Sequence, residues 1–89
     1  MTSRTTKSFR KLFTALTPEL QRAAEKAYRK WRENPAHPSL DFKRVHATQP
    51  IYSARITLGC RSVGVLSGTQ MVWFWLGSHN DYDNLLRQL

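Results

Sequence analysis

The stretch YSARITLGCRSVGVLSGTQMVWFWL, residues 52–76, decides the fold of this chain because it holds three strand patterns separated by two tight turns. Residues 52–58 alternate apolar and polar side chains, which is the period of a half-buried strand. After a turn at Gly59 and Cys60, residues 61–66 predict a second strand, and Ser67-Gly68-Thr69 predicts the next turn. Residues 70–76 predict a third strand, and because residues 71–76 are apolar on both faces, this strand should lie in the interior of the sheet. The result is an antiparallel meander of three strands.

Helical patterns lie on the N-terminal side of this meander. Residues 2–7 are compatible with a short strand, and Ser8 is the expected N-cap of a first helical segment that ends near Leu16. Thr17-Pro18-Glu19 predicts the start of a second helix, with Thr17 as N-cap and Pro18 at the first helical position. An apolar stripe runs from Leu20 to Trp31, and Asn34-Pro35 ends the helix. These two helices form a hairpin.

The remaining segments complete the predicted fold. Residues 40–45 predict a short strand at the edge of the sheet, and Ser78 followed by Asp81 resembles a capping box at the start of a last helix. The expected fold class is α+β, with an N-terminal helical hairpin packed on an antiparallel meander sheet of three to five strands and a short C-terminal helix. A chain of 89 residues forms one domain, residues 1–89.

Composition narrows the classes of function. Fourteen Lys and Arg against six Asp and Glu give a net charge of +8, and residues 1–50 hold eleven of those cations against four acids. Such an excess favours a polyanionic partner, with nucleic acid first. The single cysteine, Cys60, allows no internal disulfide, no Cys-based zinc finger and no iron–sulfur cluster, and the composition predicts a cytoplasmic protein. The longest apolar run, residues 71–77, is too short for a membrane helix, so we expect neither export nor membrane insertion.

Several motifs in this order resemble one known family. The chain from Lys7 to Leu89 resembles the RelE/ParE superfamily of bacterial type II toxins, and within it the RelE-like cytotoxins. The matching residues are Lys7-Ser8-Phe9, Asn34-Pro35, His37-Pro38, Leu40, residues 52–56 (YSARI), residues 61–64 (RSVG) and residues 73–83 (WFWLGSHNDYD).

The resemblance implies a small cytosolic toxin that a cognate antitoxin neutralises. RelE-type members cut mRNA in the ribosomal decoding site without metal or cofactor, whereas ParE-type members poison DNA gyrase. The expected partners are therefore an acidic antitoxin, the ribosome and mRNA, with operator DNA reached only through the antitoxin complex and no membrane. The rival functions are a gyrase inhibitor without chemistry of its own and an inactive relative that only binds an antitoxin.

Metal-free RNA cleavage uses the 2′-hydroxyl as nucleophile and needs a base, an acid and cations for the charged phosphorane. Arg55 and Arg61 fall on neighbouring predicted strands and could clamp a phosphate on the open side of the sheet. The resemblance implies that Arg61 contacts the scissile phosphate and that His79 is a catalytic acid or base. Tyr82 is a catalytic candidate whose ring could stack on a base, but its position in an apolar stripe with Leu85 favours packing.

Further cations complete the candidate site. Lys43, Arg44 and His46 form a basic run that could bind the phosphate, or could simply keep a sheet edge solvated. The meander contains neither Asp nor Glu, so the sequence identifies no carboxylate base. Cys60 has no activating neighbour beyond Arg61, and the three histidines lack the spacing of metal ligands. The outward face of the helical hairpin is either a solvated helix face or a contact with the ribosomal RNA backbone, and its excess of cations favours the RNA contact. These cations are Lys11, Arg22, Lys26, Arg29, Lys30 and Arg32.

Overall fold

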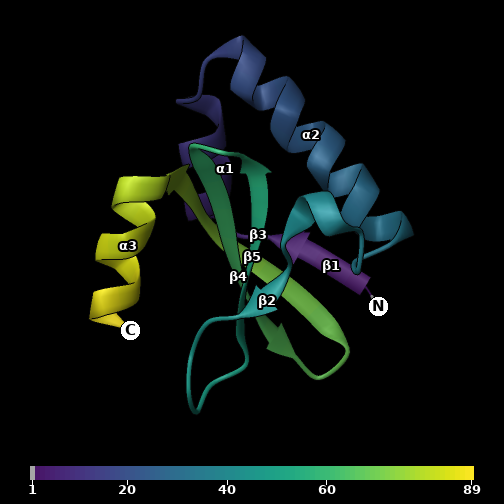
Figure 1. The fold of residues 1–89 in the computed structure, drawn as a ribbon, viewed down its shortest axis with the longest axis vertical. Coiled ribbons are helices and arrows are strands. Elements are labelled where there is room, and N and C mark those ends of the chain that lie inside the picture. Colours follow the sequence, from purple (N-terminus) through teal and green to yellow (C-terminus); the bar gives the residue numbers. More distant parts are fainter. Residues whose placement is uncertain (1) are drawn as a thin grey trace.

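The computed structural model describes residues 2–89, which form a five-stranded sheet with helices on both faces (Figure 1). The elements in chain order are β1 (Thr2–Thr5), α1 (Lys7–Thr14), α2 (Pro18–Glu33), the 3₁₀ helix η1 (Pro38–Leu40), β2 (Lys43–Arg44), β3 (Ile51–Thr57), β4 (Cys60–Ser67), β5 (Gln70–Ser78) and α3 (His79–Gln88). The predicted α+β class, the helical hairpin and the C-terminal helix are confirmed.

The order of strands in the sheet is β1-β5-β4-β3-β2. The meander β3-β4-β5 is antiparallel as predicted, and β5 lies between two strands, as its apolar sequence requires. The turn after β4 uses Gly68, whose φ of 60° suits a residue without a side chain. A purely antiparallel sheet was expected, but β1 pairs parallel to β5, so the sheet is mixed.

Three local predictions are wrong for identifiable reasons. The N-cap of α1 is Thr6 and not Ser8, because the Thr6 side chain accepts the Phe9 N–H at 3.1 Å. The edge strand predicted over residues 40–45 shrinks to β2, because Leu40 ends the 3₁₀ helix and Asp41 takes a left-handed conformation with φ of 42°. Leu58, expected on the buried face, is 84% exposed because the strand register shifts before Thr57 and Leu58 falls in the turn.

The helical hairpin covers one face of the sheet. Thr17 caps α2 by accepting the Leu20 N–H at 3.3 Å, and Pro18 occupies the first turn. Trp31 of α2 packs in a buried cluster against Ala54 of β3 and Trp73 of β5. The backbone of Gly64 comes so close to Trp73 that an added Cβ would lie 2.9 Å from the indole, which explains the glycine in the middle of β4.

The helix α3 covers the opposite face. Its N-cap, Ser78, accepts the Asp81 N–H at 3.1 Å, as the capping pattern predicts. Tyr82 of α3 forms a second buried cluster with Ile51 of β3 and Val63 of β4. Since side chains alternate along a strand, Ser53 and Arg55 share the Ile51 face of β3, and Arg61 shares the Val63 face of β4. The candidate residues therefore gather on the side of the sheet that carries α3.

Candidate anion-binding and catalytic site

Three segments of the chain meet at the end of the sheet where β3 ends, β4 begins and β5 runs into α3. The antiparallel register pairs Arg55 with Arg61, and Arg61 with Gly77, two residues before His79. The His79 N–H donates to the Gly59 carbonyl at 2.9 Å, which ties the start of α3 to the β3–β4 turn. Residues that are 24 positions apart in the sequence, from Arg55 to His79, thus lie at one end of the sheet.

Arg61 is a buried cation with fixed partners, not the solvent-facing clamp that the sequence predicted. Only 3% of the residue is exposed, because α3 and the segment before β2 cover it. Its Nη2 donates to the Ser53 hydroxyl at 2.9 Å and to the Asp41 carbonyl at 3.0 Å. The guanidinium carbon also lies 5.2 Å from the centre of the Tyr82 ring. These contacts hold the guanidinium in one position.

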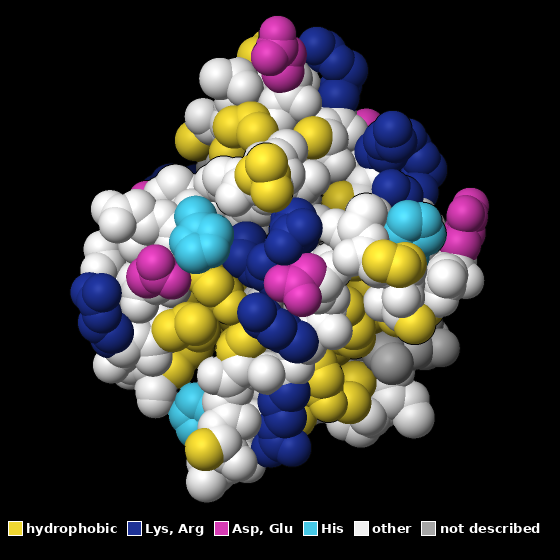
Figure 2. All heavy atoms as spheres, in the orientation of Figure 1, with side chains coloured by type: hydrophobic (Ala, Val, Ile, Leu, Met, Phe, Trp, Pro, Cys, Tyr) yellow, Lys and Arg dark blue, Asp and Glu magenta, His cyan; other side chains and the backbone are white. Residues whose placement is uncertain are grey.

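The carboxylate of Asp41 is surrounded by three cations, and we call this group the Asp41 cluster: Asp41, Lys43, Arg55 and Arg61. One oxygen, Oδ2, lies 3.1 Å from Arg61 Nη1, 3.4 Å from Lys43 Nζ and 3.7 Å from Arg55 Nη2. Figure 2 shows basic side chains grouped around an acidic one near the middle of the visible face. Partial desolvation by itself would raise the pKa of the Asp41 carboxyl, but Lys43 and Arg61 lower that pKa below its ordinary value of 3.8.

Tyr82 packs, as its place in the apolar stripe favours. The residue is 4% exposed, and its hydroxyl donates to Ser53 Oγ at 3.1 Å. Ser53 is fully buried and accepts from both Arg61 and Tyr82. The Tyr82 ring is therefore closed to the base stacking that the sequence suggested, and it supports the Arg61 guanidinium instead.

His79 is half-exposed at the first position of α3, with 53% of its side chain accessible. Its ring meets the Tyr82 ring edge-on, with centroids 5.7 Å apart. Nδ1 lies 3.5 Å from Asp83 Oδ2, one helical turn further on, and Nε2 has no partner among residues 2–89. The Asp83 carboxylate can thus orient the imidazole while Nε2 stays open to a ligand.

Arg44 and His46 do not join the Asp41 cluster; both stabilise the loop between β2 and β3. Arg44 Nε donates to the carbonyls of His46 and Gln49, each at 3.1 Å. His46 Nδ1 accepts the Gln49 N–H at 2.9 Å, and Nε2 lies 3.2 Å from the Leu89 carbonyl. A ring whose two nitrogens already bind the backbone is poorly suited to proton transfer.

The basic face of the hairpin is separate from the Asp41 cluster, because α2 covers the opposite face of the sheet. Lys30 donates to Ser39 at 3.1 Å, and the Arg32 guanidinium lies 5.8 Å from the centre of the Tyr28 ring. The other predicted RNA contacts are exposed: Lys11, Arg22, Lys26 and Arg29. The predicted RNA contact of this face stays a prediction.

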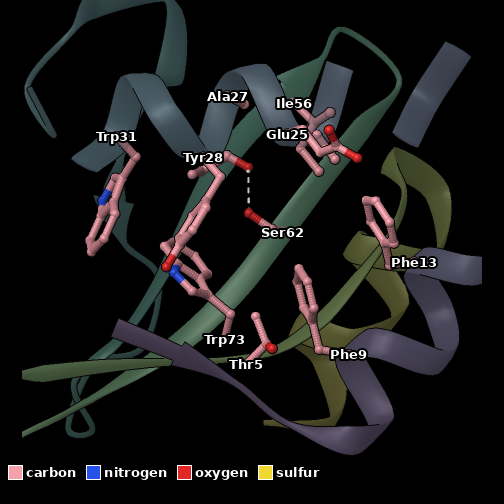
Figure 3. Close-up of a pocket in the computed structure, with 12 residues that line it drawn as sticks. Thr5, Phe9, Phe13, Glu25, Ala27, Tyr28, Trp31, Ile56, Ser62 and Trp73 are labelled. Atoms are coloured by element: carbon pink, nitrogen blue, oxygen red, sulfur yellow. Dashed lines mark hydrogen bonds between the residues drawn. The ribbon is translucent and has the colours of Figure 1, made fainter. Parts of the chain in front are cut away.

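An apolar pocket lies between the helical hairpin and the sheet. Figure 3 shows Phe9 and Tyr28 from the helices and Trp73 from β5 around it, with the Ser62 hydroxyl bonded to the Ala54 carbonyl at its base. No titratable group of the Asp41 cluster lines this pocket.

Other kinds of site find no support in residues 2–89. Within that range no three His, Cys, Asp or Glu side chains gather in a way that could hold a metal ion, and no helix is long and apolar enough to cross a membrane. Cys60 is 3% exposed, and burial raises the pKa of its thiol, which disfavours the nucleophilic thiolate.

Asp41, Ser53 and Asp83 were missed by reasoning from sequence. Asp83 had a usable signal, since it follows His79 by four residues on a predicted helix. Asp41 had only its nearness to the basic run, because its side chain reaches the cluster through a left-handed backbone that no pattern revealed. Ser53 looked like any polar residue of an alternating strand.

Comparison with known proteins finds one matching family model and several solved structures with a similar fold. Residues 18–84 match the model of a family described as the ParE-like toxin domain. A chain of the RelB–RelE antitoxin–toxin complex from Methanococcus jannaschii is similar in fold, with a TM-score of 0.72, 11% identity, and coverage of 91% of this chain and 95% of that one.

Two further solved structures show the same likeness. The YoeB/ParE toxin from Agrobacterium tumefaciens has a TM-score of 0.70 and 16% identity over 89% of this chain and 99% of that one. YafQ from E. coli has a TM-score of 0.70 and 9% identity over 90% of this chain and 94% of that one. No curated protein matches the sequence. At such low identities the solved structures show a shared fold alone.

Proposed function

Because this chain belongs to the ParE-like toxin domain family, and is thus a toxin of the RelE/ParE superfamily, we propose that it is a ribosome-dependent, metal-independent endoribonuclease that cuts translated mRNA. The observation that carries the proposal is the convergence of Lys43, Arg55 and Arg61 on one carboxylate oxygen. The His79 ring and the Arg61 guanidinium both contact the Tyr82 ring, which places the imidazole near these cations. Cations that gather around one anionic oxygen suit a phosphodiester and the charge of its phosphorane.

The reaction forms a bond between the 2′ oxygen and phosphorus and breaks the bond between phosphorus and the 5′ oxygen. One proton leaves the 2′ hydroxyl and one is added to the 5′ oxygen, so that the products are a 2′,3′-cyclic phosphate and a 5′ hydroxyl. The lowered pKa of Asp41 makes its carboxylate a weak base. We therefore assign one proton transfer to His79 Nε2, with Asp83 as the positioning residue at Nδ1.

The cations have graded roles in this proposal. Arg55 and Lys43 keep 38% and 53% of their side chains exposed and can contact a phosphate directly. Arg61 supplies a fixed positive charge beneath them, and Tyr82 holds it there through Ser53. The exposed cations of α2 and α1 would bind the ribosomal RNA backbone, which would make affinity fall with salt.

An antitoxin is the expected protein partner, since a similar fold occurs in a solved antitoxin–toxin complex. A net charge of +8 favours an acidic partner. The apolar pocket under the hairpin would receive apolar side chains of such a partner (Figure 3). We further propose that the protein acts in the cytoplasm and reaches operator DNA only within the antitoxin complex.

The ParE-like family description also favours a second candidate, inhibition of DNA gyrase by binding alone. A gyrase inhibitor would not need the His79 imidazole or the three converging cations. An inactive relative that only binds an antitoxin would not inhibit growth and would not need these residues.

Inducible expression followed by mapping of transcript 5′ ends separates these functions. The endoribonuclease predicts growth arrest with cuts confined to translated frames, and loss of those cuts in His79→Ala. Asn80→Ala, an exposed neighbour in the same helical turn, is the matched control and should cut like the parent. Growth arrest with intact transcripts and induced DNA damage would refute the endoribonuclease and support the gyrase inhibitor.

A further inference from the structure

The Asp41 cluster contains its own anion. Asp41 Oδ2 accepts from Arg61 Nη1 at 3.1 Å and forms ion pairs with Lys43 at 3.4 Å and Arg55 at 3.7 Å. A non-bridging oxygen of a phosphate would take the same three partners. The carboxylate therefore stands where a bound phosphate oxygen would make its best contacts.

The backbone of Asp41 aims the carboxylate into this position. Among residues 2–89, Asp41 is the one residue other than glycine with a positive φ, at 42°. The left-handed conformation is disfavoured for most side chains, and Asp and Asn tolerate it best after Gly. The Asp41 N–H donates to the Pro38 carbonyl at 3.2 Å, and the Asp41 carbonyl accepts from Arg61 Nη2 at 3.0 Å. Hydrogen bonds that do not involve the carboxylate thus fix the Asp41 backbone. Rotation of the Asp41 side chain alone would therefore break its contacts with the three cations.

The three cations would respond differently to the loss of the Asp41 carboxylate. Arg61 keeps the Ser53 hydroxyl, the Asp41 carbonyl and the Tyr82 ring when the carboxylate leaves. Arg55 and Lys43 already face solvent. Three positive charges would then surround an open position with a buried floor, which favours capture of an anion.

We propose that Asp41 is an internal competitor that occupies the phosphate position of the Asp41 cluster and must swing out before a phosphodiester can bind there. The identity of the ligand as a phosphodiester rests on the proposed function, whereas the competition itself follows from the contacts. In the free protein the carboxylate would weaken binding of stray anions, and a substrate held by other contacts would displace it.

Titration of the full chain with inorganic phosphate, followed by NMR of backbone amides and arginine side chains, tests this. Asp41→Asn keeps the tolerated backbone and a side-chain oxygen but removes the charge. We expect it to bind phosphate at least tenfold more tightly than the parent, with the largest shifts at Arg55, Arg61 and the backbone near Lys43. Glu33→Gln changes the net charge equally at an exposed position on α2 and should stay within twofold of the parent.

Two outcomes overturn the proposal. Asp41→Asn could bind phosphate within twofold of the parent, or its gain could persist when Arg55→Gln is added. Asp41→Gly, which also accepts a positive φ, repeats the test if the amide variant does not fold. No RNA or ribosome enters this titration, so a chain that fails to cut RNA would leave the result intact, and a failed competition would leave the cleavage assay intact.

Discussion

Replacing Ser53 with alanine tests whether the buried hydroxyl joins the two halves of the site. Ser53 is 0% exposed, and its Oγ accepts from Arg61 Nη2 at 2.9 Å and from the Tyr82 hydroxyl at 3.1 Å. In Ser53→Ala, Arg61 keeps its contacts to Asp41, but the buried Tyr82 hydroxyl loses the one hydrogen-bond partner that it has among residues 2–89.

The expected loss follows from these two contacts. A buried donor without a partner costs about 1–3 kcal/mol, and a hydrogen bond from a charged group contributes about 1.5–3 kcal/mol. Since Arg61 keeps its hydrogen bonds to Asp41, we expect the free energy of unfolding to fall by about 3 kcal/mol. In a domain of this size, each kcal/mol lowers the melting temperature by about 4–8 °C. Urea unfolding followed by tryptophan fluorescence measures it.

Ser62→Ala is the matched control. Ser62 is 8% exposed and makes one long hydrogen bond, at 3.4 Å, to the Ala54 carbonyl. Its loss should cost about 0.5–1 kcal/mol. In a Tyr82→Phe background no hydroxyl is orphaned, so Ser53→Ala should cost at least about 1 kcal/mol less. Equal losses for the two serine variants, or an unchanged loss in the Phe background, would refute the role of Ser53.

Three further predictions concern charge and packing. Because the pKa of Asp41 is lowered in the folded chain, its ionised carboxylate stabilises the fold fully above its ordinary pKa of 3.8, and this stabilisation is lost as pH falls through the lower folded pKa. The free energy of unfolding, measured from acid to neutral pH, should therefore fall less steeply below pH 3.8 in Asp41→Asn than in the parent. Gly64→Ala should lower the free energy of unfolding by about 1–3 kcal/mol, since its Cβ would meet Trp73 at 2.9 Å, while Gly59→Ala, with nothing within 4 Å, should change it little in the same urea assay. Replacing Lys26 and Arg29 with glutamine should reduce the salt dependence of RNA binding by about 0.7 log units per log unit of salt for each cation, and an unchanged slope would remove α2 from the RNA contact.

Local rules recovered the fold where side-chain period and capping decide the structure. The alternation over residues 52–58 and the caps at Thr17 and Ser78 acted within a few residues and could be read directly. The parallel pairing of β1 with β5 joins residues about seventy positions apart, and no local pattern encodes such a partner. The 3₁₀ turn that ends at Leu40 and the left-handed backbone of Asp41 explain why residues 40–45 keep only two residues of strand, and the side-chain pattern gives no sign of either.

The sequence predicts only those features of the site that follow from local strand pairing. A hairpin register brings Arg55 beside Arg61, so their adjacency follows from the meander. Whether Arg61 faces water depends on how α3 docks, and that docking buries it. Asp41 enters the site through one unusual backbone torsion, and His46 leaves it through loop hydrogen bonds, neither of which a residue pattern specifies.

Primer extension on a reconstituted translation reaction, with the purified chain added in the presence and absence of ribosomes, tests directly whether the protein cuts translated mRNA. We expect cuts within the reading frame that require ribosomes, leave a 5′ hydroxyl, and fall by about 10²–10⁴-fold in His79→Ala while Asn80→Ala retains them. Intact mRNA under conditions in which the chain stops cell growth, or parental cleavage by His79→Ala, would contradict this expectation.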